Sequence, residues 1–297
     1  MVQDSTTRVS SCLLQELKKQ KQKIIALTAY DYPTAKILDE AGVEVILVGD
    51  SLGMVVLGYE TTLPVTMEEM IHHTKAVTRA RKRAMVIGDL PYLSFHLSLK
   101  DSILNAARFI KEAGADGVKL EGASPQRLEL VKALVEAEIP VMGHVGLTPQ
   151  SVQKLGGFKV QGMDEEKAEA IFRGALELEK AGAFSVVLES IPLELAKEIT
   201  DALKIPTIGI GAGPYCDGQI LVINDLLGLT SGHLPRFVKK YADLTGIISR
   251  AVNDYISDVR QARYPEDQHC YHLPKGKPGL IKKLRQKTVR EKYKKPD

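Results

Sequence analysis

Short runs of apolar residues recur along the chain, and most of them are continuous rather than alternating with polar residues. They predict eight strands, at Ile24–Thr28, Val45–Gly49, Ala84–Gly88, Gly117–Leu120, Pro140–Gly143, Ser185–Leu188, Thr207–Ile210 and Ile220–Ile223. A continuous apolar strand is buried on both faces, which is typical of parallel sheets that helices cover.

Segments with helical spacing lie between most of these strands. They predict helices at Thr34–Ala41, Met67–Arg81, Lys100–Ala113, Pro125–Glu136, Glu165–Ala181 and Leu193–Leu203. Thr66 and Glu69 form a capping box, and Ser124 before Pro125 supplies an N-cap followed by a first-turn proline. These start signals support the helical interpretation.

The alternation of strands and helices favours a TIM (β/α)8 barrel, an α/β fold. A doubly wound sheet is the alternative, but no GxGxxG follows the first strand, which weakens a dinucleotide site. We expect a helix at Ser11–Gln22 to cap the barrel bottom, and a further helix at Pro235–Ser257. We interpret the polar, Gly-rich residues 147–163 as a lid. Residues 1–263 are predicted to form one barrel domain and residues 264–297 a basic extension.

An internal repeat supports this organisation. An Ala-Gly pair ends a predicted helix at Gly42, Gly114 and Gly182, and a buried strand follows each pair. Glycine at such a helix end adopts the left-handed conformation without steric cost. In each repeat the strand leads to a carboxylate.

Composition and cysteine usage are those of an ordinary globular protein. The chain has 297 residues, of which 44% are hydrophobic and 26% charged. No apolar run approaches the roughly 18 residues that span a bilayer, and the N-terminus lacks the apolar region of a secretory signal. Cys12, Cys216 and Cys270 are far apart and odd in number, which supports neither a disulfide framework nor a cysteine zinc site. We expect a cytoplasmic protein that does not bind a membrane.

Basic residues are concentrated at the C-terminus. Residues 271–297 carry ten Lys and Arg against two Asp and Glu, whereas the rest carries 30 basic and 35 acidic residues. A basic tail can bind nucleic acid, but most such ends are solvated. Tyr293 is the one aromatic residue in its densest part, so a base-stacking platform is not indicated. A nucleic-acid-binding protein is therefore the less favoured alternative to an enzyme with small-molecule substrates.

Candidate chemistry gathers at the ends of the predicted strands, where α/β barrels carry their active sites. Four carboxylates follow four different strands there: Asp50, Asp89, Glu121 and Glu189. If they converge, their mutual repulsion requires a cation. Hard oxygen ligands without cysteine pairs favour Mg²⁺, which takes one or two carboxylates and keeps waters and substrate oxygens. The remaining carboxylates then act through water or as a base.

Lys119 and His144 reach the same strand ends. Lys119 precedes Glu121 by two residues, so both side chains lie on the same side of the strand. Lys119 forms either a structural ion pair, a clamp for a substrate carboxylate or a Schiff base, and a nearby metal favours the clamp. His144 bonds substrate or water, or is structural.

Two further features have open interpretations. The loop Gly209–Gly213 either holds an anion on its backbone amides or packs tightly at the barrel rim. The pair His72-His73 is interpreted as a surface or packing pair, because no histidine metal motif is present.

Long motifs in the chain resemble the ketopantoate hydroxymethyltransferase family. They are Thr28–Asp31, Val48–Met54, Thr62–Thr66, Gly88–Pro91, Val118–Gly122, Gly143–Gln150, Gly156–Gly162 and Ile208–Gly213. The resemblance runs from about residue 11 to about residue 272, and the basic tail is not a usual part of the family pattern.

The resemblance implies a TIM barrel of the phosphoenolpyruvate/pyruvate type. It also implies transfer of a one-carbon unit from 5,10-methylenetetrahydrofolate to 3-methyl-2-oxobutanoate, giving 2-dehydropantoate in pantothenate biosynthesis. A Mg²⁺ ketoacid lyase or phosphonomutase of the same barrel type, which would not use folate, is the alternative enzyme.

The family motifs also imply roles for individual residues. Asp50 and Asp89 bind Mg²⁺ and lie at the substrate, and Glu121 completes the metal site. Ser51 and Lys119 hold the ketoacid, Glu189 is the general base, and His144 is a supporting substrate-site residue. The family implies a homo-oligomer, commonly a decamer.

Overall fold

The computed structural model describes residues 7–155, 157, 159–230, 232, 234–274 and 279–292. Internal contacts divide the chain into two compact units, Met1–Asp243 and Leu244–Asp297. The first unit contains the barrel, and the second contains the helices Leu244–Arg260 and Gly279–Lys292. The proposed division into a domain at 1–263 and an extension at 264–297 stays a prediction.

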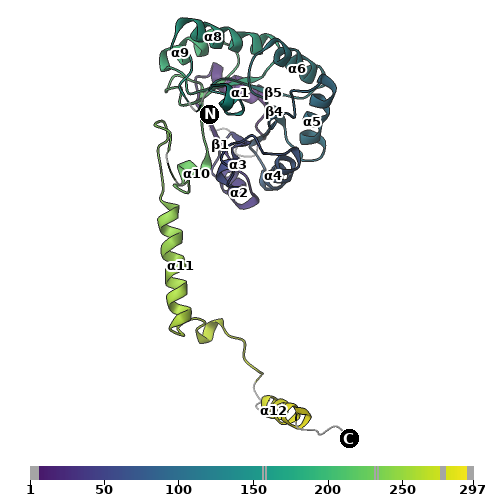
Figure 1. The fold of residues 1–297 in the computed structure, drawn as a ribbon, viewed down its shortest axis with the longest axis vertical. Helices are drawn as coiled ribbons and strands as arrows, with labels where there is room; N and C mark the ends of the chain where they lie inside the picture. The colour runs from purple at the N-terminus through teal and green to yellow at the C-terminus, as the bar shows by residue number, and fades with distance from the viewer. Residues whose placement is uncertain are drawn as a thin grey trace. The chain divides into compact units, whose positions relative to one another are not determined.

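Within the described residues, eight parallel strands form one closed barrel (Figure 1). The strands are β1 Ile24–Thr28, β2 Val45–Val48, β3 Met85–Asp89, β4 Gly117–Lys119, β5 Val141–Gly146, β6 Ser185–Glu189, β7 Thr207–Ile210 and β8 Gly218–Leu221. Each pairs with the next along the chain, and β8 pairs with β1. The predicted TIM barrel is confirmed, and an open doubly wound sheet is excluded.

Helices surround most of this barrel. Those of the first unit are α1 Ser11–Lys19, α2 Tyr32–Glu40, α3 Leu52–Val55, α4 Met67–Ala80, α5 Leu99–Lys111, α6 Pro125–Glu136, α7 Val152–Leu155, α8 Glu165–Lys180, α9 Leu193–Ala202 and α10 Ile223–Leu226, with a 3-10 turn η1 at Pro149–Ser151. The predicted capping box of α4 and N-cap of α6 are present. Gly42, Gly114 and Gly182 all have positive φ, as the repeat predicted.

The barrel interior is filled by alternate residues of the strands. Val45 and Leu47 of β2 belong to this inner cluster, whereas Ile46 and Val48 pack outward against the helices. Both faces of β2 are therefore buried, which explains its continuous apolar run.

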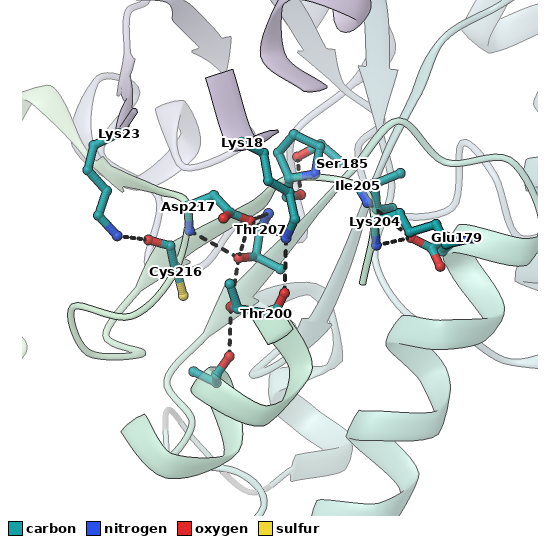
Figure 2. Close-up of polar contacts among 12 residues, drawn as sticks. Lys18, Lys23, Glu179, Ser185, Thr200, Lys204, Ile205, Thr207, Cys216 and Asp217 are labelled. Atoms are coloured by element: carbon teal, nitrogen blue, oxygen red, sulfur yellow. Dashed lines mark hydrogen bonds and ion pairs between the residues drawn. The ribbon is translucent and has the colours of Figure 1, made fainter. Parts of the chain in front are cut away.

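Helix α1 covers the bottom of the barrel, as predicted. Its Leu14 and Leu17 are buried and belong to the inner cluster. Lys18 donates to Asp217 at 2.7 Å, and Asp217 accepts from the backbone N–H of Thr207 at 2.9 Å (Figure 2). The Lys18–Asp217 ion pair and the hydrogen bonds of Asp217 to Thr207 fix the amino ends of β7 and β8.

Two predicted elements were wrong in position. The last strand is Gly218–Leu221 rather than Ile220–Ile223, since Gly218 pairs with Ile24 and the N–H of Ile223 donates to Thr28 Oγ1 at the start of α10. The helix predicted at Pro235–Ser257 is α11, Leu244–Arg260. The preceding residues are held in irregular structure, where the Tyr241 N–H donates to the Leu226 carbonyl.

The predicted lid, residues 147–163, contains η1 and α7. Residues 156 and 158 of this segment lie outside the described residues. The start of the segment is firmly held, because the Leu147 N–H donates to the Glu189 carbonyl at 2.9 Å.

The layer of helices around the barrel is incomplete beside β7 and β8. A loop without a helix follows β7, and α10, which has four residues, follows β8. Ile25 on the neighbouring β1 is consequently 48% exposed. A groove at this place is lined by Ile25, Phe237 and Tyr241, among other residues.

The second unit contains α11, a 3-10 turn η2 at Asp267–His269, and α12, Gly279–Lys292. Helix α11 has no buried residue. Within the described residues, no helix is long and apolar enough to cross a membrane.

Candidate active site

A cavity opens at the carboxyl ends of the strands and collects the candidate residues of the sequence. Its empty volume is about 550 Å³, counted out to its open mouth. Its lining includes Asp50, Ser51, Asp89, Lys119, Glu121, His144 and Glu189. All of the residues expected at a metal, at a substrate and as a base therefore share one cavity.

The alternation of strand residues explains why these side chains point inward. Met142 and Val187 fill the barrel interior, and His144 and Glu189 continue the same inward rows two residues later. Asp89 follows Ile87 in the same way. The sequence thus places polar groups wherever an inward row leaves the core and reaches the mouth.

Lys119 is the central cation of the cavity. Its ammonium donates to both carboxylate oxygens of Asp89 at 2.9 Å and lies 3.9 Å from Glu121 Oε1. Burial lowers the pKa of Lys119, but the charges of Asp89 and Glu121 outweigh this effect and raise the pKa overall. Lys119 therefore stays protonated, which favours a charge clamp over a Schiff-base nucleophile.

The cavity disfavours the negatively charged forms of Asp50 and Glu121. Burial, followed by the nearby Asp89, raises the pKa of Asp50 to about 7. Burial also raises the pKa of Glu121 well above its ordinary value, although Lys119 opposes this. Both carboxyl groups would be stabilised by a further cation.

Ser51 lies at the start of α3 but does not cap that helix with its side chain. Its hydroxyl instead forms a 2.8 Å hydrogen bond with the hydroxyl of Tyr30. Tyr30 is buried, and burial raises the pKa of its phenol. A neutral tyrosine therefore fixes Ser51 at the edge of the cavity.

His144 lies between two acidic side chains. Its Nδ1 is 3.7 Å from Glu121 Oε1, and its Nε2 is 3.3 Å from Glu189 Oε2. Burial lowers the pKa of His144, and Lys119 lowers it further. Within the described part of the chain neither ring nitrogen makes a hydrogen bond, so a neutral imidazole remains able to bind a ligand or water.

Sequence reasoning missed Gln150 as a site residue. It is buried, and its amide donates to Asp50 Oδ2 and to the Leu90 carbonyl, both at 2.9 Å. Its backbone N–H donates to Glu121 Oε2 at 3.1 Å. The signal was present, because Gln150 is the last residue of the motif Gly143–Gln150, but it follows no strand directly.

The carboxylates of the cavity fit Mg²⁺ better than a metal whose ligands all come from protein side chains. Among the described residues, no group of three or more acidic, histidine or cysteine side chains is placed so that it could hold a metal ion, so Asp50, Asp89 and Glu121 are not assembled as three direct ligands. Asp50 and Asp89 are adjacent, since the Asp50 N–H lies 3.3 Å from Asp89 Oδ2. Mg²⁺ is commonly held by one or two carboxylates, with waters and substrate oxygens completing its octahedron.

The other candidate features have structural roles. A Cβ at Gly211 would lie 2.6 Å from Phe237, and one at Gly213 would lie 2.5 Å from Leu193, so this loop is tightly packed at the rim. His72 is exposed, and His73 contacts the Tyr30 carbonyl, as a packing pair would. The three cysteines are free.

Comparison with known proteins agrees with this arrangement. The profile of the family described as "Ketopantoate hydroxymethyltransferase" matches residues 8–267. The chain belongs to the ketopantoate hydroxymethyltransferase family. The match includes all eight strands and α11, whereas α12 lies beyond it.

Relatives of high identity align with nine-tenths of the chain. A 3-methyl-2-oxobutanoate hydroxymethyltransferase of Thermoanaerobacter sp. (strain X514) is 59% identical over 268 residues, which are 90% of this chain and 97% of that protein. The protein of the same name from Syntrophomonas wolfei subsp. wolfei is 55% identical over 266 residues, or 90% of this chain and 96% of that protein.

Solved structures of the same fold are much more distant in sequence. A phosphonopyruvate hydrolase in complex with oxalate and Mg²⁺ has a TM-score of 0.56 at 13% identity and covers 96% of this chain and 99% of its own. A 2,3-dimethylmalate lyase of the PEP mutase/isocitrate lyase superfamily has a TM-score of 0.57 at 14% identity and covers 95% and 96%. At these identities the likeness supports the barrel fold alone.

Proposed function

We infer that this chain is a 3-methyl-2-oxobutanoate hydroxymethyltransferase of pantothenate biosynthesis. It transfers a hydroxymethyl group from 5,10-methylenetetrahydrofolate to 3-methyl-2-oxobutanoate and gives 2-dehydropantoate. The 59% identity to a relative of that name, over 90% of the chain, carries this inference. The gathering of the candidate residues around one cavity supports it.

Asp50 and Asp89 would hold Mg²⁺, with Glu121 completing the site directly or through water. When bound, the ion supplies Lewis acidity that stabilises negative charge on the ketone oxygen. The surplus of buried carboxylates over Lys119 supports a cation at this place, because burial first, and then the neighbouring like charges, raise the pKa of Asp50 and of Glu121.

Lys119 and Ser51 are proposed to hold the ketoacid. Lys119 keeps its positive charge in the cavity and so attracts the substrate carboxylate. Ser51 is held by Tyr30 and supplies a hydroxyl for hydrogen bonding at the cavity wall. His144, unpartnered at both ring nitrogens among the described residues, supports the substrate from the side of β5.

Glu189 is proposed as the general base. Among the described residues it has no Lys or Arg within ion-pair distance, unlike Asp89, and the neutral imidazole of His144 lies 3.3 Å from its Oε2. Its side chain is 17% exposed, so it is the carboxylate most open to the cavity. It would remove the proton from C3 of the ketoacid, and C3 would then bond to the methylene carbon of the folate. Both C–N bonds of that carbon break in the overall reaction, water supplies the hydroxyl group, and tetrahydrofolate leaves with the two protons on its nitrogens.

A homo-oligomer, commonly a decamer in this family, is proposed for the assembled enzyme. Apolar surface left uncovered in both units supports association. Helix α11 exposes Ile248, Val252, Tyr255 and Ile256, and the groove beside β1 exposes Ile25. A cytoplasmic location stays a prediction.

Product formation from 3-methyl-2-oxobutanoate and 5,10-methylenetetrahydrofolate tests the function directly. We expect 2-dehydropantoate that depends on the folate and disappears with EDTA. Metal-dependent conversion of a ketoacid without folate would favour a lyase or mutase of the same fold. Undiminished turnover in EDTA would contradict the metal site but not the transfer reaction.

A further inference from the structure

Gln150 bonds two of the three carboxylates expected at the metal and the backbone beside the third. Its side-chain amide donates to Asp50 Oδ2, and to the carbonyl of Leu90, the residue after Asp89. Its backbone N–H donates to Glu121 Oε2. One residue of the loop after β5 is thereby bonded to the carboxyl ends of β2, β3 and β4.

The orientation of the Gln150 amide follows from its partners. A carboxylate oxygen and a backbone carbonyl are both acceptors, so the NH₂ group has to face them. The amide oxygen points elsewhere and, within the described residues, is buried without a hydrogen bond. Gln150 therefore donates to Asp50. Rotating the amide by 180° would place its oxygen against two other acceptors, so the reverse orientation is unfavourable.

The loop that carries Gln150 is held by backbone geometry. Gly146 has φ of +100°, and a Cβ there would collide with the Glu189 carbonyl oxygen. That carbonyl accepts the Leu147 N–H at 2.9 Å, and Pro149 starts the turn η1. The turn is thus attached to β6 and delivers Gln150 at a fixed place over the cavity mouth.

We propose that Gln150 is a positioning residue that orients Asp50 and Glu121 toward Mg²⁺ and the ketoacid. The inference rests on the Mg²⁺ and ketoacid binding proposed above. Gln150 engages one oxygen of each carboxylate, which leaves the other oxygen of each for the ion or its water. Partners that orient metal ligands in this way matter for metal affinity nearly as much as the ligands themselves.

The test replaces Gln150 by methionine, which has a similar volume and no donor. Gln153→Met is the matched control, because Gln153 lies in the same segment and is exposed. Calorimetric titration of the purified enzyme with Mg²⁺ in the presence of 3-methyl-2-oxobutanoate reports binding without turnover. Steady-state KM values for the ketoacid and the folate, and thermal unfolding, are measured on the same preparations.

In Gln150→Met we expect Mg²⁺ and ketoacid binding to weaken by about 10-fold to 100-fold. The folate KM and the unfolding temperature should stay close to those of the parent, and Gln153→Met should resemble the parent throughout. Binding within about twofold of the parent would overturn the proposal. So would parallel losses in folate KM and unfolding temperature, since these indicate a general structural role.

If Gln150→Met does not fold, Gln150→Asn decides the matter by the same criteria, because its shorter amide keeps the polarity but not the reach. Failure of the proposed function is distinguishable from failure of this inference. In the first case the parent enzyme itself shows no Mg²⁺-dependent ketoacid binding, whereas in the second the parent binds and the variant binds equally well.

Discussion

At the scale of single residues, the decisive feature is that four carboxylates share a mouth with one lysine. Asp89 is neutralised by Lys119 at 2.9 Å, and Glu189 is not. The same chemical group therefore takes different roles according to its neighbours. An ion-paired carboxylate is a poor base, whereas an unpaired carboxylate beside a neutral imidazole can accept a proton.

Replacement of Glu189 by glutamine tests the base. We expect exchange of the C3 proton of 3-methyl-2-oxobutanoate to fall by about 100-fold to 10,000-fold, as is usual for loss of a general base. Mg²⁺-dependent ketoacid binding should be largely retained. Exchange is followed by proton NMR in deuterium oxide.

Glu194→Gln is the control for that experiment, since Glu194 is an exposed carboxylate on α9, the helix that follows the same strand. It should exchange like the parent. Unchanged exchange in Glu189→Gln would remove Glu189 from the role of base.

The raised pKa of Asp50 makes a prediction about pH. In the folded protein this pKa is about 7 instead of 3.8, so the folded state binds the proton more tightly than the unfolded state. Without metal, stability should therefore fall as pH rises between these values, by at most about 1.4 kcal/mol per pH unit for this group. Because Mg²⁺ competes with the proton, its stabilising effect should be larger at about pH 8 than at about pH 5.

Thermal unfolding in EDTA and in Mg²⁺ at fixed protein concentration measures both effects. Asp50→Asn cannot ionise at this position, so its stability in EDTA should depend less on pH, with a remaining slope from Glu121. Identical pH profiles for the parent and Asp50→Asn would show that Asp50 does not titrate as inferred.

At the scale of elements, the local sequence pattern was sufficient to predict most of the strands and helices of the barrel. Buried parallel strands, helix caps and glycines at helix ends are encoded by neighbouring residues, and they were found where predicted. The last strand was misplaced because Gly218, which carries no apolar signal, pairs with Ile24 and Ile208. Pairing across the closing seam of the barrel, and not local composition, selected the register.

Helix α11 carries an apolar stripe that the described residues of the second unit do not bury. Ile248, Val252, Tyr255, Ile256 and Val259 follow helical spacing, and their exposed fractions range from 37% to 57%. We expect Val252→Asp combined with Ile256→Asp to reduce the mass of the oligomer, because a charged residue in an apolar interface is costly to desolvate.

Light scattering after size exclusion measures that mass. Asn253→Asp adds a negative charge off the stripe and should leave the assembly intact. An unchanged mass in the doubly substituted protein would mean that α11 is not part of the interface.

At the scale of the whole molecule, the part of the chain that matches the family and the basic tail are different segments of the sequence. The family match ends at residue 267, whereas the excess of basic residues begins at Tyr271. We expect removal of residues 268–297 to change kcat/KM by less than about twofold, since the cavity lies in the first unit.

The same truncation addresses the less favoured nucleic-acid hypothesis. Binding of duplex DNA by the full chain and the truncated chain is compared over a range of salt concentrations. A steep salt dependence that vanishes with the tail would support nucleic-acid binding, because phosphate contacts release counterions. Weak binding that is equal in both chains is the expected result.

The sequence by itself determined the barrel, the strand ends that carry the site and the identity of its charged residues. These depend on the two-residue alternation of strands, which a local pattern records. Only the tertiary structure decided that Lys119 binds Asp89 more closely than Glu121, that Tyr30 holds Ser51, and that Gln150 reaches the ends of β2, β3 and β4. Such contacts join residues far apart in the chain, and closure of the barrel is the physical event that brings them within hydrogen-bonding distance.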